Sequence, residues 1–471
     1  MENNNKDGEE MGTRFDQTDM TRMGKIQELK GRFILDVHVD LCWIRADYSN
    51  NVRNGLNASE TLNLLDISIG SPTSGGQYHW VSELASSHYQ RVLSYITGWM
   101  SVLAWQAGAA SGSFLTGTII QGLISVKDST SWMPRIQNLL LALHILCFVI
   151  VITVLWAMAP QQPAHALFLE FSNTGGWSSM GLALMVGQTS AIYAGLSSDA
   201  TAHMAEEVRD AGRYVPIAII WGFFTNGAMA IVLVITYLFA MPSLEDALDD
   251  PTGFPFIYVF KNAVGTAGVN DLTAIILIPV IFSNILFNAS TARQTYAFAR
   301  DKGLPFAKWI CKVNPKQKLP VNAIGLSCVI SGLLALINIG SDTAFHAIIT
   351  LNVAALMWTY VVSVGCLLYR RLSCPETLPP QRWSMGKYGI WVNAAALVYV
   401  VFAFFSLWPT STPVTLTTFN WSVVIFLTVF FISGVMYIIK GQKEYAEPVI
   451  SVRRDAMPQA LVNRHGIRRE I

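Results

Sequence analysis

Long uncharged stretches occupy most of the chain after residue 91. Eight runs of at least 21 residues contain no Asp, Glu, Lys or Arg, and two prolines, Pro409 and Pro413, divide the last run into two segments. A membrane-spanning helix needs about 20 mostly apolar residues and satisfies its own backbone hydrogen bonds. The pattern therefore predicts nine spanning helices, with cores at 92–124, 137–158, 178–208, 215–240, 272–297, 321–339, 344–369, 389–408 and 420–439.

The composition agrees with an all-α integral membrane protein. Of the 471 residues, 52% are hydrophobic and 13% are charged, whereas a soluble domain has about 25% charged residues. So much apolar surface must face lipid. The sequence has no Walker loop, HExxH or GxSxG motif, and its six cysteines are scattered singly. We therefore expect no enzyme activity, no cofactor, no bound metal, no nucleic-acid partner and reduced cysteines.

The positions of Lys and Arg predict the orientation in the membrane. The 293–318 segment carries seven of them, and 370–387 and the tail after Lys440 are also basic. The alternate segments 159–177, 340–342 and 409–419 carry none, and 241–271 has one Lys against five acids. Cytoplasmic loops are enriched in Lys and Arg. We expect a multi-pass protein with a cytoplasmic C-terminus.

Three regions follow from this pattern. Residues 1–90 are predicted to be a polar, largely disordered N-terminal region, 91–440 a transmembrane domain, and 441–471 a cytoplasmic tail. Nine crossings would place the N-terminus outside, yet Arg22, Lys25, Lys30 and Arg32 form a basic segment of the cytoplasmic kind. Either the first long uncharged run does not cross the membrane as one ordinary span, or the chain lacks a spanning helix.

Residues 193–208 are the most informative stretch. An apolar segment leads here into small and polar residues, namely Tyr193, Gly195, Ser197, Ser198, Asp199, His203 and Glu206. Asp199, His203 and Glu206 are spaced to share one helical face. A broken helix at this point could bind a small charged solute, with these ionisable groups carrying a proton. The alternative is a helix that ends at Ser198 and continues in solvent.

Two other segments carry polar groups in apolar surroundings. Asn284 and Asn288 share a face of one predicted helix, where they could line a substrate path or hydrogen-bond a neighbouring helix. Trp105 and Gln106 lie in a stretch rich in small residues that favours close helix packing, and they are the weaker candidates for a pocket. His144 is expected to be a buried, satisfied histidine. Arg293 and Arg300 are expected to be cytoplasmic anchors.

Several motifs together resemble fungal permeases of the amino-acid/choline transporter family, within the amino acid–polyamine–organocation superfamily. They include RMGK at 22–25, PTSGGQYHW at 72–80, SYITGW at 94–99, DATAHMAEEV at 199–208 and ARDKGLP at 299–305. The resemblance implies a leucine-transporter-like inverted-repeat fold of twelve helices and secondary active transport of an amino acid or a small amine such as choline or γ-aminobutyrate. It also implies proton coupling and a plasma-membrane location.

On this template the 178–208 span resembles the sixth family helix, with residues 193–199 at its unwound centre. The sequence departs from the family at 33–71, which are polar where helices 1 and 2 belong, and no fourth helix fits between 126 and 136. The resemblance therefore implies a truncated fold of about nine helices. A competing hypothesis is a truncated product, or the product of an erroneous gene prediction, that transports nothing and associates with a full-length permease.

Overall fold

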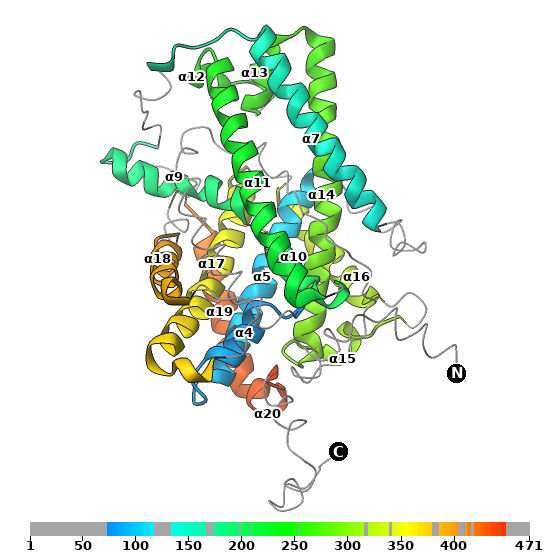
Figure 1. Ribbon diagram of the computed structural model, residues 1–471, viewed down its shortest axis with the longest axis vertical. Coiled ribbons are helices and arrows are strands. Elements are labelled where there is room, and N and C mark those ends of the chain that lie inside the picture. The colour runs from blue at the N-terminus through cyan, green and yellow to red at the C-terminus, as the bar shows by residue number, and fades with distance from the viewer. Residues whose placement is uncertain are drawn as a thin grey trace, which may run out of the picture.

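The computed structural model describes residues 73–116, 133–165, 173, 175–196, 199–208, 210–252, 254–314, 319–338, 342–378, 386–403, 409, 412–415 and 419–448. Within these ranges a helix lies in each of the nine predicted spans (Figure 1). The long helices are α5 (Gln90–Thr116), α7 (Met133–Met158), α9 (Met180–Gly195), α11 (Ala211–Ala240), α14 (Thr266–Arg300), α16 (Val321–Asn338), α17 (Asp342–Ser373), α18 (Gly389–Phe402) and α19 (Ser422–Met436). The polar 33–71 stretch lies outside the described residues.

Short helices connect or flank the long ones. The α-helical ones are α4 (Gln77–Leu84), α10 (Ala200–His203), α12 (Leu244–Leu248), α13 (Pro255–Ala263), α15 (Ala307–Ile310) and α20 (Gln442–Glu444). The 3-10 turns are η4 (Ala205–Glu207), η5 (Pro375–Thr377) and η6 (Gly386–Tyr388), and η8 (Tyr437–Gly441) is a π-helical turn.

Helix α17 forms the centre of the structure together with α5 and α4. Its apolar window is 78% buried, compared with 22% for α11, 28% for α14 and 17% in the span that contains α19. The helical segments that contain α11, α14, α17 and α19 are each long and apolar enough to cross a membrane. The peripheral helices present large apolar side chains outward, such as Trp221 on α11 and Phe431 on α19, which are 63% and 71% exposed. Lipid replaces protein as the partner of such side chains, so the exposed apolar surface fits a bilayer.

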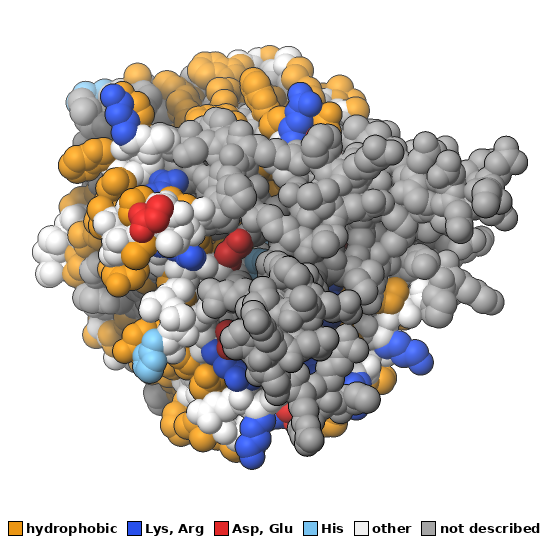
Figure 2. Space-filling model, turned by 60° about the horizontal axis from the view of Figure 1, so that its bottom comes forward, with side chains coloured by type: hydrophobic (Ala, Val, Ile, Leu, Met, Phe, Trp, Pro, Cys, Tyr) orange, Lys and Arg blue, Asp and Glu red, His pale blue; other side chains and the backbone are white. Residues whose placement is uncertain are grey.

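The two ends of the helix bundle differ in charge. The end that carries α12 and α13 has Glu245, Asp246, Asp249 and Asp250, and we call it the acidic end. At the opposite end, around α4, α15 and α20, Lys and Arg side chains are distributed over the described part of the surface (Figure 2). We call this the basic end. The separation agrees with the loop charges in the sequence.

The structure corrects several boundaries. Helix α14 continues to Arg300, so the basic segment that was predicted to begin at residue 293 starts inside a helix. Arg293 and Arg300 were expected to be cytoplasmic anchors, but each has a partner within the protein. The Arg293 side chain is 2% exposed and donates to the Ala289 carbonyl, and the Arg300 side chain, 16% exposed, pairs with Glu206. Helix α4 lies within the range assigned to the N-terminal region, and most of its side chains are buried. The domain limits remain a prediction.

Candidate functional site

The predicted 178–208 span is interrupted. Helix α9 ends at Gly195, Leu196 adopts an extended backbone, and the chain becomes helical again at α10 after Asp199. The four-residue α10 leads directly into η4. A helix interruption exposes backbone carbonyls at one end and amides at the other, and both are available to ligands. Because Asp199, His203 and Glu206 are all buried, the alternative of a solvated continuation is wrong.

Asp199 is held at this interruption by residues from two elements. The Gln77 side-chain amide at the start of α4 donates to Asp199 Oδ2 at 2.5 Å, and His203 Nε2 lies 3.7 Å from the same oxygen. Asp199 is 0% exposed. Its second oxygen, Oδ1, has no hydrogen-bond partner among the residues that the structure describes. A buried carboxylate oxygen without a donor is costly, so this atom is available to a cationic or protonated partner.

The Gln77 amide belongs to a longer polar chain. Its carbonyl oxygen accepts from Ser101 Oγ on α5 at 3.5 Å, and Ser101 Oγ accepts from Gln294 Nε2 on α14 at 2.7 Å. Each of these side chains is fully buried. These hydrogen bonds connect Asp199 through Gln77 to α5 and α14, so these two helices fix the orientation of the Gln77 side chain.

Glu206 forms the second charged contact of the site. Arg300 Nη1 and Nη2, at the end of α14, donate to Glu206 Oε2 and Oε1 at 2.9 and 2.8 Å. The Ser74 backbone amide donates to the same Oε1 at 3.4 Å. Two parallel charge-assisted bonds fix both distance and orientation. The pair therefore connects η4 to the basic end of α14.

The histidine is packed as closely as the two acids. His203 Nδ1 lies 3.0 Å from the Ser74 carbonyl oxygen, and its ring meets the Trp105 ring edge-to-face with centroids 4.8 Å apart. Gly76 has φ +54°, and a Cβ there would come within 2.6 Å of His203 Cε1. A side chain at position 76 would therefore be strained in its backbone and would collide with the imidazole.

The remaining predicted site residues lie in other places. The Tyr193 hydroxyl, on α9, is 2.6 Å from Ser111 Oγ on α5. On α14, Asn288 Nδ2 donates to the Asn284 carbonyl at 3.1 Å, and Asn288 is fully buried. Gly195 is the last residue of α9, and Ser197 and Ser198 lie outside the described residues. The structure thus groups Asp199 and His203 in direct contact and places Glu206 beside them through Ser74, which contacts both His203 and Glu206.

Several residues of the site were missed by the sequence reasoning or weighed too lightly. Gln77, Ser74 and Gly76 belong to the SGGQYHW motif, which contributed only to the resemblance, and Trp105 was a weak candidate. Ser101 and Gln294 have no local signal, because a single polar residue in an apolar helix has many explanations. The SGGQYHW motif was the available signal in the sequence for Ser74, Gly76 and Gln77.

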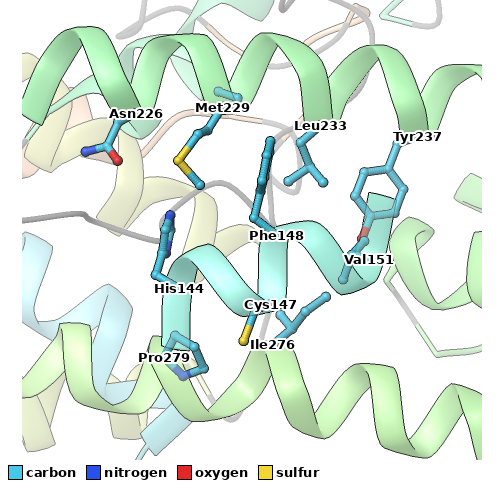
Figure 3. Close-up of a pocket in the computed structure, with 11 residues that line it drawn as sticks. His144, Cys147, Phe148, Val151, Asn226, Met229, Leu233, Tyr237, Ile276 and Pro279 are labelled. Carbon is cyan, nitrogen blue, oxygen red and sulfur yellow. The ribbon is translucent and has the colours of Figure 1, made fainter. Parts of the chain in front are cut away.

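His144 lines a small cavity between α7, α11 and α14 (Figure 3). It is 6% exposed, as expected of a buried histidine, and its Nδ1 has no protein hydrogen-bond partner among the described residues. Most of the other lining residues are apolar, among them Phe148, Leu233 and Ile276. The cavity volume of about 40 Å³ suffices for a water molecule or two. It is too small for an amino acid.

Comparison with known proteins identifies the family. A family model described as amino acid permease matches residues 128–431. The chain belongs to this family. Membership places it among transport proteins rather than enzymes, and the apolar helices make it a multi-pass membrane protein.

The permease has similar relatives in fungi. It is 28% identical over 424 residues to an uncharacterized amino-acid permease of Schizosaccharomyces pombe, covering 83% of this chain and 78% of the relative. It is 28% identical over 411 residues to the choline transporter of Saccharomyces cerevisiae, covering 81% and 72%. The GABA-specific permease of the same yeast is 24% identical over 435 residues, covering 83% and 74%.

A solved structure supports the fold. A manganese transporter from Eremococcus coleocola aligns with a TM-score of 0.50 and 12% identity, over 94% of this chain and 97% of that one. The permease therefore has the leucine-transporter-like inverted-repeat fold. The absence of three family helices stays a prediction from the sequence.

Proposed function

We propose that this permease carries an amino acid, or a small amine such as choline or γ-aminobutyrate, across the plasma membrane, and that a proton gradient drives this transport. The family and the names of its fungal relatives support this substrate class. Alternating access would occur around the interruption between α9 and α10, because broken helices are the elements that bind solutes and move in transporters of this kind.

The observation that carries the proposal is the buried Asp199 carboxylate. Its Oδ2 accepts a hydrogen bond from Gln77, while its Oδ1 has no partner within the described part of the chain. An ionised carboxylate buried in this way costs free energy until a cation or a proton neutralises it. A substrate ammonium group or a transported proton would supply that charge, and both belong to the proposed reaction.

The neighbouring residues suit the other parts of such a substrate. The backbone at Gly195, Ser197 and Ser198 would bind a substrate carboxylate or hydroxyl, and the Tyr193 hydroxyl would be a further polar contact for the substrate. A quaternary ammonium has no N–H to donate, so choline would rely on the charge of Asp199 and on an aromatic face such as Trp105. Asn284 and Asn288 would line the path along α14.

The coupling proton would move among Asp199, His203 and Glu206. The Asp199–His203 contact of 3.7 Å allows a proton on His203 to stabilise the ionised carboxylate. Glu206 is held by Arg300 and would become available when that pair opens. Opening at the basic end, proposed to be cytoplasmic, would then be coupled to proton release.

Uptake by cells that express this chain tests the proposal. Labelled choline, γ-aminobutyrate and a panel of amino acids are offered at external pH 5 to 7.5. We expect saturable, pH-dependent uptake of at least one, a loss of about 100-fold or more in Asp199→Asn, and partial retention in Asp199→Glu. Asp250→Asn, which alters an acid paired with Lys261 at the acidic end, is the control and should transport normally. Unchanged uptake by Asp199→Asn would refute the site.

The polar 33–71 stretch favours a second hypothesis, a chain that transports nothing and associates with a full-length permease. This hypothesis predicts no saturable uptake from the chain alone at normal surface levels. It also predicts co-purification with a tagged full-length relative and a changed transport rate of that relative. Saturable uptake by the chain alone excludes it.

A further inference from the structure

The segment after α19 folds back onto the basic end of the bundle. The chain passes through η8 and α20, adopts an extended backbone at Tyr445 and continues to Glu447 outside any helix (Figure 1). We call residues 437–447 the C-terminal brace. Tyr445 is 2% exposed and Glu447 is 7% exposed, although both follow the last spanning helix. A tail that merely left the membrane would be solvated, so this burial needs a reason.

The Tyr445 side chain is held by both its ring and its hydroxyl. The ring meets Tyr95 of α5 edge-to-face with centroids 5.2 Å apart, and Phe298 of α14 lies 6.0 Å away. The hydroxyl is 2.7 Å from Ser94 Oγ. Because Ser94 donates its one hydroxyl hydrogen to the Tyr78 carbonyl, Tyr445 is the donor in this contact. Burial raises the pKa of Tyr445 well above its ordinary value, so the donor proton is retained.

Charge and backbone contacts hold the rest of the brace. Arg91 Nη2 donates to the Tyr445 carbonyl at 2.7 Å, and Arg91 Nε lies 3.4 Å from Glu447 Oε1. The Ala446 amide donates to the Asp301 carbonyl at 3.1 Å. The brace therefore joins the start of α5 to the residue that follows α14.

These contacts lie next to the two charged pairs of the site. The Tyr78 hydroxyl donates to Asp301 Oδ2 at 2.9 Å. Tyr78 follows Gln77, the partner of Asp199, and Asp301 follows Arg300, the partner of Glu206. One side chain, Tyr445, is thus connected through Ser94 to Tyr78, and its neighbour Ala446 is bonded to Asp301. Gln77 and Arg300 are therefore each adjacent in the chain to a residue that the brace holds. These residues are Tyr78, held through Ser94, and Asp301, held directly.

We propose that Tyr445 and Glu447 are positioning residues that hold Gln77 and Arg300 where they meet Asp199 and Glu206, and so keep the basic end closed. Loss of the brace would free the start of α4 and the end of α14, and water would reach the Ser74–Glu206 region more often. The consequence for transport rests on the proposed function. The bracing itself is a statement about accessibility and does not require that the chain transports.

Thiol labelling of the full chain in permeabilised membranes tests this inference. Ser74→Cys places a thiol at a position that is 0% exposed beside Glu206. A membrane-impermeant maleimide is added, and the labelling rate of each thiol is read by peptide mass spectrometry. The exposed Cys374 is the internal reference, and the buried Cys147 on α7 reports general loosening. The brace variants are Tyr445→Phe, which keeps the ring, Glu447→Gln, and the conservative Glu447→Asp.

We expect the ratio of labelling at position 74 to labelling at Cys374 to rise about fivefold in Tyr445→Phe, which loses a buried hydrogen bond. It should rise about twofold in Glu447→Gln, where the partner Arg91 is partly exposed, and stay at the parental value in Glu447→Asp. An unchanged ratio in the first two variants overturns the inference, as does a parallel rise at Cys147. Absence of uptake by the parent chain would count against the proposed function alone.

Discussion

The two halves of α14 belong to the same helix but have different surroundings. In the first half the buried residues are Val269, Leu272, Ile276 and Pro279, which form a single stripe, and the side chains between them are exposed or half-buried. In the second half every residue from Asn288 to Ala299 is buried. At a rise of 1.5 Å per residue the 35-residue helix is about 52 Å long, which exceeds the hydrocarbon thickness of about 30 Å.

This difference shows what each half contributes. The outward side chains of the first half need only be apolar, because lipid accepts any shape. The second half is surrounded by α5, α10 and α16 and carries the polar contacts of the site, including Gln294 and Arg300. Its side chains must therefore fit specific neighbours. The comparison predicts that equivalent changes will have unequal effects in the two halves.

The largest contrast should come from removing an apolar side chain. Phe298 is 0% exposed and packs against Tyr78 and Tyr95, so Phe298→Ala should lower the free energy of unfolding by about 3–5 kcal/mol. Ile278, in the first half, is 46% exposed, and lipid or detergent fills the space left by Ile278→Ala. That control should lose less than about 1 kcal/mol. Unfolding of the purified proteins in detergent measures both, and equal losses would contradict the comparison.

Removing a cation gives the next contrast. Arg300→Gln leaves the fully buried Glu206 carboxylate without its partner, which should cost about 3 kcal/mol. Lys261→Gln removes the partner of Asp250 at the acidic end, where the Lys261 side chain is 44% exposed, and should cost about 0–1 kcal/mol. The same unfolding measurement applies. If Lys261→Gln lowered the free energy of unfolding more than Arg300→Gln does, the Arg300–Glu206 pair would not be a main stabilising contact of the basic end.

The smallest contrast concerns close packing at glycine. A Cβ at Gly98 on α5 would overlap the Phe298 ring, so Gly98→Ala should cost about 1–3 kcal/mol because the ring must move. Gly227 on α11 has open space around it, and Gly227→Ala should be neutral or slightly stabilising. Thermal midpoints in detergent distinguish the two variants. A neutral Gly98→Ala would mean that the ring repacks freely and that the second half of α14 is looser than its burial indicates.

The sequence by itself determined the membrane class, the nine helical segments and the charge difference between the two ends. These features depend on local composition, because about 20 apolar residues suffice to specify a spanning helix. The sequence also located the interruption near Asp199, since glycine, serines and an acid follow one another there. It treated Arg300 as a cytoplasmic anchor and did not indicate its pairing with Glu206, because a basic residue at a helix end is usually solvated and Glu206 lies 94 residues away in the chain.

Only the tertiary structure decided which polar residues meet. Gln77 and Asp199 are separated by 122 residues, and Ser94 and Tyr445 by 351. Such contacts depend on how α4, α5, α10, α14 and the C-terminal brace pack, and hydrophobic periodicity carries no information about partners so far apart. The physical reason is that lipid exposure is a property of each segment, whereas a buried hydrogen bond is a property of two segments that packing brings together.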